Sequence, residues 1–181
     1  MLTLVYLILV IIALVAWVIT LLVGTGAIAF FVARVPYAPT PKRNVEKIID
    51  LLELKPGQKF YDLGCGDGRF IQAAAKRGAQ AVGFEIAPWP FIKAKVRLWL
   101  SGSPATIYYR NFYHADLSDA DAVYCFLLNS VMAKVEKKLA ADLKPGAKLL
   151  SYGFILPNTK PTRLITLHTG KRANHLYYYR Y

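Results

Sequence analysis

The hydrophobic pattern divides the chain into two unlike parts at residue 33. Residues 1–33 are almost continuously apolar and contain no charged side chain, which predicts one long helix. A proline-rich stretch follows at residues 35–41, where regular helix is excluded. Beyond it, segments with apolar residues at every third or fourth position alternate with short apolar runs. The first pattern is typical of amphipathic helices and the second of buried strands.

The second part of the chain therefore predicts alternating helices and strands. Helices are expected at residues 44–54, 69–77, 91–100 and 130–143, and strands at residues 59–63, 80–86, 106–110, 121–128, 148–154, 163–167 and 175–181. Strands that alternate with helices form a parallel sheet covered on both faces. The last two strands are separated by a polar turn and predict an antiparallel hairpin. The fold class is α/β, a doubly wound, mostly parallel sheet of seven strands.

The apolar N-terminal segment is long enough to cross a bilayer as a transmembrane helix, which requires about 20 apolar residues. A cleaved signal peptide is the alternative, but the segment has no basic start, a longer apolar run and no convincing cleavage site. Glycines at residues 24 and 26 are expected to loosen or end the helix. Arg34, Lys42 and Arg43 follow the segment and no basic residue precedes it, which predicts an outside N-terminus and a cytoplasmic second part.

Charge and cysteine content restrict the function classes. The chain has 23 Lys and Arg against 11 Asp and Glu, a net charge of +12, and every charged residue lies after residue 33. The basic residues form no dense run, so attraction to an anionic membrane surface is favoured over nucleic-acid binding. Cys65 and Cys125 lie in unrelated contexts without the spacing of a zinc site, and no metal is expected.

One segment has the pattern of a ligand-binding loop. Gly64, Gly66 and Gly68 lie between a predicted strand and a predicted helix, where glycines allow a tight turn and close approach of a ligand. The first N–H groups of the following helix favour anionic groups. Glu85 ends the next predicted strand, where a carboxylate can accept hydrogen bonds from both hydroxyls of a ribose. The two features together indicate a nucleoside-containing ligand.

Residues 62–69 (DLGCGDGR), followed by a strand that ends near Glu85, resemble the motif of class I, seven-stranded S-adenosylmethionine-dependent methyltransferases with a Rossmann-like fold. Four further segments narrow the resemblance: residues 37–40 (YAPT), 88–89 (PW), 135–139 (VEKKL) and 154–157 (FILP). Together they resemble the membrane-anchored mitochondrial lysine methyltransferases of adenine nucleotide translocase and ATP synthase c-subunit. Small archaeal protein lysine methyltransferases are similar. The likeness covers nearly all of residues 36–181.

The resemblance implies S-adenosylmethionine as the cofactor and assigns the glycine-rich loop to its methionine part. Gly64, Gly66 and Gly68 would border this part of the cofactor. Asp62 and Asp67 would hold its amino group or order the loop. These two roles for the aspartates stay open at this point.

Other residues are implied to bind the rest of the cofactor. Glu85 would bind the ribose, Asn111 would accept a hydrogen bond from the adenine amine, and Phe112 would pack near the adenine ring. Tyr37 and Thr40 would close over the cofactor from the N-terminal side.

The same resemblance implies methyl transfer to lysine side chains of a protein, above all a membrane protein. Tyr37 and Asn129 are the candidate catalytic residues that would contact the acceptor. The segment ending at Asn129 lacks the Asn/Asp-Pro-Pro-Tyr/Phe motif of methyltransferases that act on nucleobase or amide nitrogens, which argues against nucleic-acid methylation. Two alternatives remain: a methyltransferase for a lipid or small amphiphilic molecule, and an inert module that only binds S-adenosylmethionine.

These expectations divide the chain into three regions. Residues 1–33 form a single-pass membrane anchor, residues 34–54 a linker and helix that close over the cofactor, and residues 55–181 the methyltransferase domain. The anchor makes the bilayer a partner of the protein. It places the catalytic part on the cytoplasmic side, or on the matrix side if the protein is mitochondrial.

Overall fold

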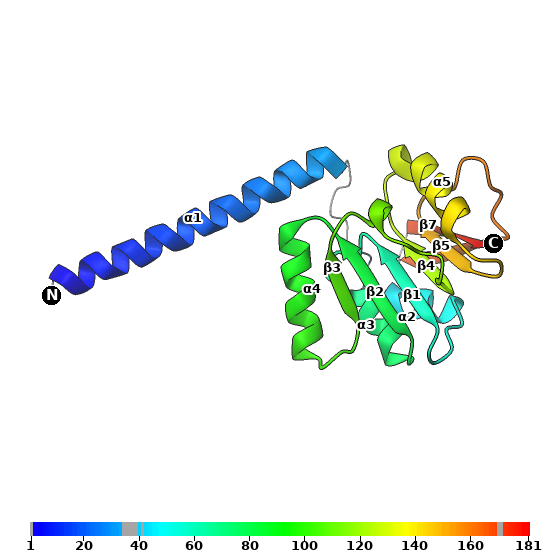
Figure 1. The fold of residues 1–181 in the computed structure, drawn as a ribbon, viewed down its shortest axis with the longest axis horizontal. Coiled ribbons are helices and arrows are strands. Elements are labelled where there is room, and N and C mark those ends of the chain that lie inside the picture. Colours follow the sequence, from blue (N-terminus) through cyan, green and yellow to red (C-terminus); the bar gives the residue numbers. More distant parts are fainter. Residues whose placement is uncertain (1, 34–39, 41, 170–171) are drawn as a thin grey trace.

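The computed structural model describes residues 2–33, 40, 42–169 and 172–181. The helix α1 (Leu2–Ala33) extends away from a layered domain built on one sheet of seven strands (Figure 1). The strand order is β3-β2-β1-β4-β5-β7-β6. Strands β1 to β5 pair in parallel, whereas β7 is antiparallel to both β5 and β6. The expected seven-stranded, mostly parallel sheet and the final hairpin are confirmed.

The elements follow the hydrophobic pattern closely. The strands are β1 (Lys59–Leu63), β2 (Gln80–Glu85), β3 (Thr106–Tyr109), β4 (Ala122–Cys125), β5 (Lys148–Tyr152), β6 (Arg163–Thr169) and β7 (Arg172–Arg180). The helices after α1 are α2 (Lys42–Leu51), α3 (Arg69–Lys76), α4 (Pro88–Leu100) and α5 (Met132–Asp142). Two short 3₁₀ turns, η1 (Phe112–His114) and η2 (Asn129–Val131), lie on either side of β4 in the chain.

Helix α1 is a single continuous helix, so the expectation that residues 24–26 loosen or end it is wrong. A glycine within a helix costs only about 1 kcal/mol relative to alanine, which does not by itself end a long helix. The hydroxyl of Thr25 also donates a hydrogen bond to the carbonyl of Leu21, at 2.8 Å. Thr25 therefore satisfies its hydroxyl within the helix and does not compete with the helical backbone.

Two other bounds differ from the expectation. The strand expected at residues 121–128 ends at Cys125, although Leu127 beyond it is still buried. A continuous apolar run shows burial but not where a strand stops. Helix α4 begins at Pro88, before the expected residue 91, because proline in the first turn lacks only an N–H that would be unpaired there.

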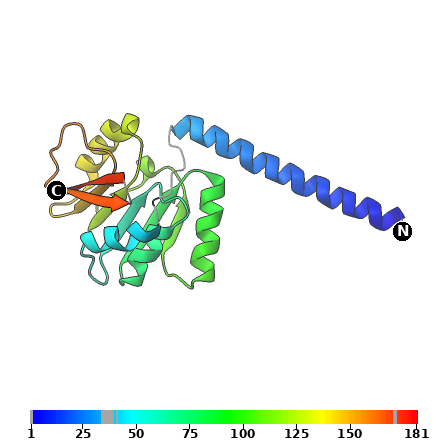
Figure 2. The same ribbon diagram turned by 180° about the vertical axis from the view of Figure 1, so that it is seen from behind.

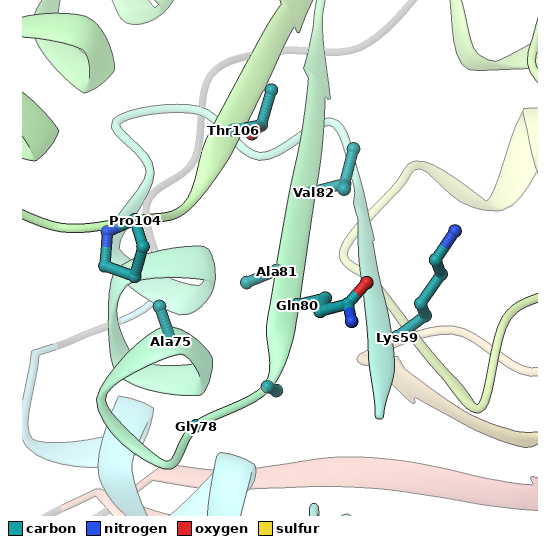
Figure 3. Close-up of a pocket in the computed structure, with 9 residues that line it drawn as sticks. Lys59, Ala75, Gly78, Gln80, Ala81, Val82, Pro104 and Thr106 are labelled. Carbon is teal, nitrogen blue, oxygen red and sulfur yellow. The ribbon is translucent and has the colours of Figure 1, made fainter. Parts of the chain in front are cut away.

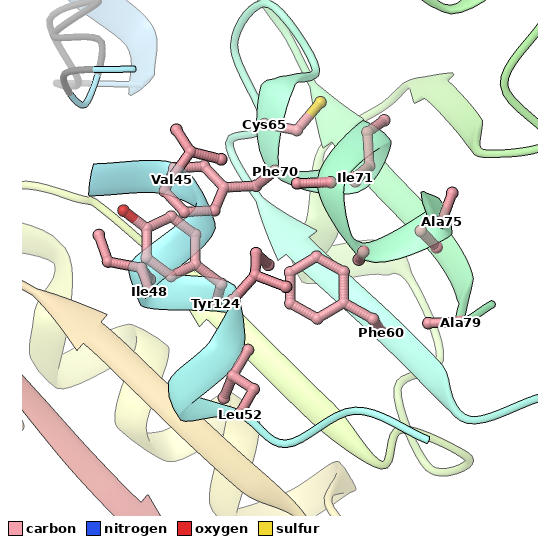
Figure 4. Close-up of a cluster of buried hydrophobic side chains, with 14 of the residues drawn as sticks. Val45, Ile48, Leu52, Phe60, Cys65, Phe70, Ile71, Ala75, Ala79 and Tyr124 are labelled. Carbon is pink, nitrogen blue, oxygen red and sulfur yellow. The ribbon is translucent and has the colours of Figure 1, made fainter. Parts of the chain in front are cut away.

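Helices cover both faces of the sheet. On one face α2, α3 and α4 pack over a buried cluster that includes Phe60, Ile71 and Tyr124 (Figure 4). On the other face α5 contributes Val135 and Leu139 to a second buried cluster. Since β1 to β4 are parallel, their carboxyl ends meet at one edge of the sheet. The loops that leave this edge carry the candidate site.

Candidate active site

The loop between β1 and α3 can turn tightly because its three glycines adopt a left-handed backbone. The angle φ is +83° at Gly64, +54° at Gly66 and +74° at Gly68, a region that residues with a Cβ rarely adopt. A Cβ on Gly68 would also lie 3.0 Å from the Cβ of Ala94 in α4. Glycine at this position thus allows the start of α3 to pack directly against α4.

Glu85, the last residue of β2, binds this loop by a hydrogen bond from the neighbouring strand. Its Oε2 accepts a hydrogen bond from the N–H of Gly66, and its Oε1 accepts from the N–H groups of Ile86 and Ala87, each at 2.8 Å. Burial raises the pKa of Glu85, and the three hydrogen bonds oppose that rise. A carboxylate has about four acceptor sites, so Glu85 can accept one further donor without losing a backbone partner.

Asp62 lies near the carboxyl end of β1 and is 1% exposed. Its Oδ2 has no hydrogen-bond partner within the described part of the chain. Burial, followed by the negative charges of Glu85 and Asp67, raises its pKa well above the usual value of an aspartate. An ammonium group would supply both the missing donor and an opposite charge. The residues present therefore fit the amino group of S-adenosylmethionine.

Asp67, in contrast, is paired with two arginines. Arg69 donates from Nε to Oδ1 and from Nη2 to Oδ2, both at 2.7 Å, and Arg97 of α4 donates from Nη2 to Oδ2 at 2.8 Å. Burial disfavours the charged carboxylate, but these hydrogen bonds and the two positive charges outweigh it and lower the pKa of Asp67. Arg97 also donates to the backbone carbonyl of Asp67, at 2.8 Å. Arg97 thereby links the loop to α4, and Arg69 links it to the start of α3.

Thr40 approaches the site from the N-terminal side. It is buried, and its hydroxyl lies 3.1 Å from the hydroxyl of Tyr124 in β4. Its carbonyl accepts a hydrogen bond from Arg69. Thr40 therefore joins β4 to the start of α3. Tyr37, the other residue expected on this side, lies outside the described residues, and its role stays a prediction.

The remaining candidates follow the next two strands. Asn111 comes after β3 and caps η1, since its side chain accepts the N–H of the residue two positions later, at 3.1 Å. The N–H of Arg110 donates to the carbonyl of Glu85 at 3.0 Å, so this turn lies beside the end of β2. Phe112 is half-buried, and Asn129 is exposed at the start of η2. All the described candidates thus lie along the carboxyl ends of β3, β2, β1 and β4 or pack against them.

Three residues of the site were not found from the sequence. Arg69 follows the last glycine of the loop directly, and a basic residue beside an acidic loop residue was a signal that could have been used. Arg97 lies within α4 among other basic residues, and Tyr124 lies within an apolar strand. Neither has a pattern that links it to the loop, because both contacts arise only when distant segments pack together.

A cavity of about 460 Å³ lies at the opposite edge of the sheet and contains none of these residues. Lys59, Gln80 and Thr106, which begin β1, β2 and β3, line it together with Gly78 and Pro104 (Figure 3). In open parallel sheets ligands bind outside the carboxyl ends of the strands. This rule favours the loops at the carboxyl edge, among them the glycine-rich loop, over this cavity as a ligand site.

The chain is similar to known proteins over most of the part that follows α1. The family model of the ANTKMT methyltransferase domain matches residues 62–163. A protein-lysine N-methyltransferase of Saccharolobus islandicus is 35% identical over 153 residues, which cover 82% of this chain and 95% of that protein. The adenine nucleotide translocase lysine N-methyltransferase of Mus musculus is 37% identical over 135 residues, covering 73% of this chain but only 58% of that protein. The chain thus spans nearly all of the first relative and little more than half of the second.

A solved structure is also similar. An RNA methyltransferase from Salinibacter ruber, in complex with S-adenosyl-L-homocysteine, matches with a TM-score of 0.73 and 32% identity, over 79% of this chain and 93% of that one. S-adenosylhomocysteine is what S-adenosylmethionine becomes after losing its methyl group, so this fold holds the cofactor expected here. The resemblance drawn from the sequence is confirmed, and so is the cofactor. The chain belongs to the ANTKMT methyltransferase domain family and is an S-adenosylmethionine-dependent enzyme of the protein-lysine methyltransferases.

Proposed function

We propose that the protein is a membrane-anchored lysine methyltransferase whose acceptor is a lysine of a membrane protein. The observation that carries the proposal is the apolar segment Thr3–Thr25 in front of a domain of this family. By length and composition it can cross a membrane, and none of it is buried against the domain. As a helix it is about 35 Å long, enough for a hydrocarbon core of about 30 Å.

Anchoring confines the domain to the surface of one membrane, which favours an acceptor in that membrane. Relatives named as lysine methyltransferases of adenine nucleotide translocase and of the ATP synthase c-subunit support an acceptor of this kind. The basic residues after α1, beginning with Arg34, support a cytoplasmic domain and an outside N-terminus. In a mitochondrion the same orientation would place the domain in the matrix.

In this proposal the chain holds the cofactor at the carboxyl ends of β1, β2 and β3. Asp62 would bind its amino group, Glu85 a ribose hydroxyl, and Asn111 and Phe112 the adenine. Asp67 would order the loop, because its carboxylate is already engaged by two arginines. When bound, S-adenosylmethionine supplies an electrophilic methyl group.

The amine of lysine must lose its proton before it can attack that methyl group. The unperturbed pKa of lysine is about 10.4, and transfer into a dry site lowers it. Residues 126–130 at the end of β4 carry no ionisable side chain that would hold the amine as a cation. Asn129 and Tyr37 would orient the amine, and positioning would supply much of the rate.

RNA methylation is a second candidate. It is favoured by the similarity to the Salinibacter ruber enzyme and by the net charge of +12. Against it, the segment ending at Asn129 lacks the proline-containing motif of methyltransferases that act on nucleobase nitrogens. A lipid or small amphiphile would be a third kind of acceptor, and an inert binding module would transfer no methyl group at all.

One labelling experiment separates these candidates. The full chain, purified in detergent, is incubated with methyl-labelled S-adenosylmethionine and with membranes and RNA from its own organism. Label in a membrane protein that yields methyl-lysine on hydrolysis is the expected result. Label confined to RNA or to extracted lipid would assign one of those acceptors instead, and no label would indicate an inert module. The variant E85A is the control: with the cofactor at about the Kd of the unaltered chain, it should lose most of the label in every fraction.

A further inference from the structure

Helix α4 has a continuous apolar face that the rest of the domain does not cover. Trp89, Ile92, Val96, Trp99 and Leu100 are all exposed, with Trp99 at 79% and Leu100 at 72%. At 3.6 residues per turn these five side chains fall within about 100° of the helix surface. They therefore form one stripe along the length of α4, which we call the α4 face.

The α4 face is bordered by lysines on both sides. Viewed along the helix, the exposed Lys93 lies next to Leu100 and the exposed Lys95 next to Trp99. The opposite side of the helix carries Ala94, which is buried against the sheet. Tryptophans between flanking lysines are typical of a helix that lies in the plane of a membrane interface. The lysine stems then cover apolar surface while the ammonium groups reach the headgroups.

The position of α4 agrees with this interpretation. Helices α1 and α4 contact each other. Figure 1 shows α4 along the edge of the domain that faces α1, running across the direction of α1 and not along it. The view from behind shows the same arrangement (Figure 2). A helix that runs across a membrane-spanning helix lies along the membrane plane, so the α4 face is presented to the leaflet from which α1 emerges.

We infer that the α4 face docks into this leaflet, with Lys93 and Lys95 against anionic lipid headgroups. The inference rests on the proposed anchoring by α1. Its consequence concerns the acceptor: α4 begins three residues after Glu85, and Arg97 joins it to Asp67 of the glycine-rich loop. Docking would hold the carboxyl edge of the sheet, where the cofactor is proposed to bind, beside the bilayer. This position would select acceptor lysines that lie at the membrane surface.

A second copy of the chain is the other occupant to consider. A two-fold contact through the α4 face would place the same surface on both sides of the interface. Lys93 and Lys95 of each copy would then lie close to those of the other, and like charges at an interface are unfavourable. Anionic headgroups complement the lysines, so the bilayer is the favoured occupant.

The three tryptophans, Trp17 in α1 and Trp89 and Trp99 in α4, make the inference directly testable. The full chain is reconstituted into vesicles of phosphatidylcholine and phosphatidylglycerol that carry a nitroxide on the acyl chain. The variant W17F/W89F reports on Trp99 alone. We expect its emission to fall about twofold or more when the nitroxide is near the headgroup, and less when it is at the chain end.

Two control variants make the result interpretable. The variant W89F/W99F reports on Trp17, which should be quenched most by the nitroxide at the chain end. Leu164 is exposed on β6, at the far edge of the sheet from β3, so L164W in a chain without the native tryptophans should show no quenching.

Each outcome decides one question. Quenching of Trp17 without quenching of Trp99 would overturn the docking of the α4 face and leave the anchor intact. An unquenched Trp17 would overturn the anchor itself. Quenching of Trp99 that is absent at high protein density and appears only when the protein is diluted in the membrane would assign the α4 face to a second copy, because that copy would shield Trp99 from the nitroxide lipids, and it would contradict docking to lipid.

Discussion

The two halves of the carboxyl edge of the sheet are built differently. At the ends of β1 and β2, Asp67 and Glu85 are buried, and each makes three hydrogen bonds through its carboxylate. At the ends of β3 and β4, Asn111 and Asn129 are exposed, and the side chain of Asn111 bonds within its own turn. One half is preorganised around fixed polar contacts, and the other presents side chains to solvent.

This difference separates contacts that are already formed before a ligand binds from contacts that form only on binding. A preorganised shell lowers the ordering cost of binding, which suits a cofactor that is identical in every turnover. Exposed side chains acquire their final contacts only when their ligand arrives, which in the proposed function is the adenine for Asn111 and the acceptor for Asn129. Substitutions in the first half should therefore change folding and cofactor affinity strongly, whereas those in the second should change turnover or affinity weakly.

The largest expected effect is on stability, from Asp67→Ala. The change leaves Arg69 and Arg97 without their shared carboxylate, and their side chains are only 14% and 25% exposed. Breaking a buried ion pair by removing one partner costs about 3 kcal/mol of the free energy of unfolding. Chemical denaturation of the full chain in detergent, followed by circular dichroism, measures this loss.

Glu46→Ala is the matched control for Asp67→Ala. Glu46 also pairs with an arginine, but it is 60% exposed, and its partner Arg77 keeps a second carboxylate in Asp50. An exposed pair of this kind contributes about 1 kcal/mol or less. Equal losses in the two variants would show that the loop does not depend on its paired aspartate.

The next effect is on cofactor affinity, from Glu85→Ala. Loss of a charged hydrogen-bond partner costs about 1.5–3 kcal/mol, roughly a ten- to hundredfold weaker Kd. Calorimetric titration of the full chain with S-adenosylmethionine measures it, with circular dichroism to establish that the variant is folded. Glu136→Ala removes another buried glutamate, one that binds Asn158 and Thr159 instead, and should leave the affinity unchanged. A folded E85A protein with normal affinity would exclude Glu85 from ribose binding.

A smaller effect is expected from pH, through Asp62. Burial and the neighbouring carboxylates raise the pKa of Asp62 in the free protein, whereas a bound ammonium group would lower it, so binding releases a proton at pH values between the two. Affinity should therefore increase as pH rises above the ordinary aspartate value, by at most about tenfold per unit, until the raised pKa is passed. Calorimetry at several pH values measures this.

Asp62→Asn tests the assignment of that proton. The variant keeps the shape of the side chain but cannot titrate, so its affinity should be lower and depend less on pH. The free energy of unfolding of the variant should increase, although its affinity for the cofactor decreases. A group with a raised folded pKa stabilises the fold below its unfolded pKa and loses that contribution as pH rises through the folded pKa. An uncharged residue here should thus raise the free energy of unfolding at neutral pH, and a decrease would contradict the cause assigned to the shift.

Most of the fold could be predicted from the sequence because periodicity reports burial directly. Phe60 and Tyr61 of β1 belong to the two different core clusters, as alternation along a strand requires. The end of β4 could not be predicted, since Leu127 is buried outside the strand and looks the same in the pattern. The order of the strands was not predicted, because periodicity shows which residues are buried but not which strands are neighbours.

The candidate site was predictable where local backbone geometry requires a particular residue. Gly64 and Gly68 have positive φ, and this requirement is visible in the sequence as glycine. Arg97 and Tyr124 were not predictable, because their partners Asp67 and Thr40 lie far away in the chain. No spacing encodes a contact that exists only after α4 and β4 have packed into place.

The smallest effects should distinguish the two asparagines of the exposed half. A neutral hydrogen bond contributes about 0.5–1.5 kcal/mol. Each alanine variant should therefore change one quantity about two- to tenfold: the Kd of the cofactor for Asn111→Ala, and the rate of methyl transfer for Asn129→Ala. Asn111→Ala should weaken cofactor binding and leave the rate at saturating cofactor unchanged, because Asn111 is assigned to the adenine. Asn129→Ala should leave the Kd of the cofactor unchanged and slow single-turnover methyl transfer. Both residues are exposed asparagines at strand ends, so each variant is a control for the other. If the substitutions acted only by disordering the loops, both variants would change the Kd of the cofactor and the single-turnover rate together. If Asn129→Ala instead weakened cofactor binding, the end of β4 would belong to the preorganised half, and the acceptor would have to approach from the side of Tyr37.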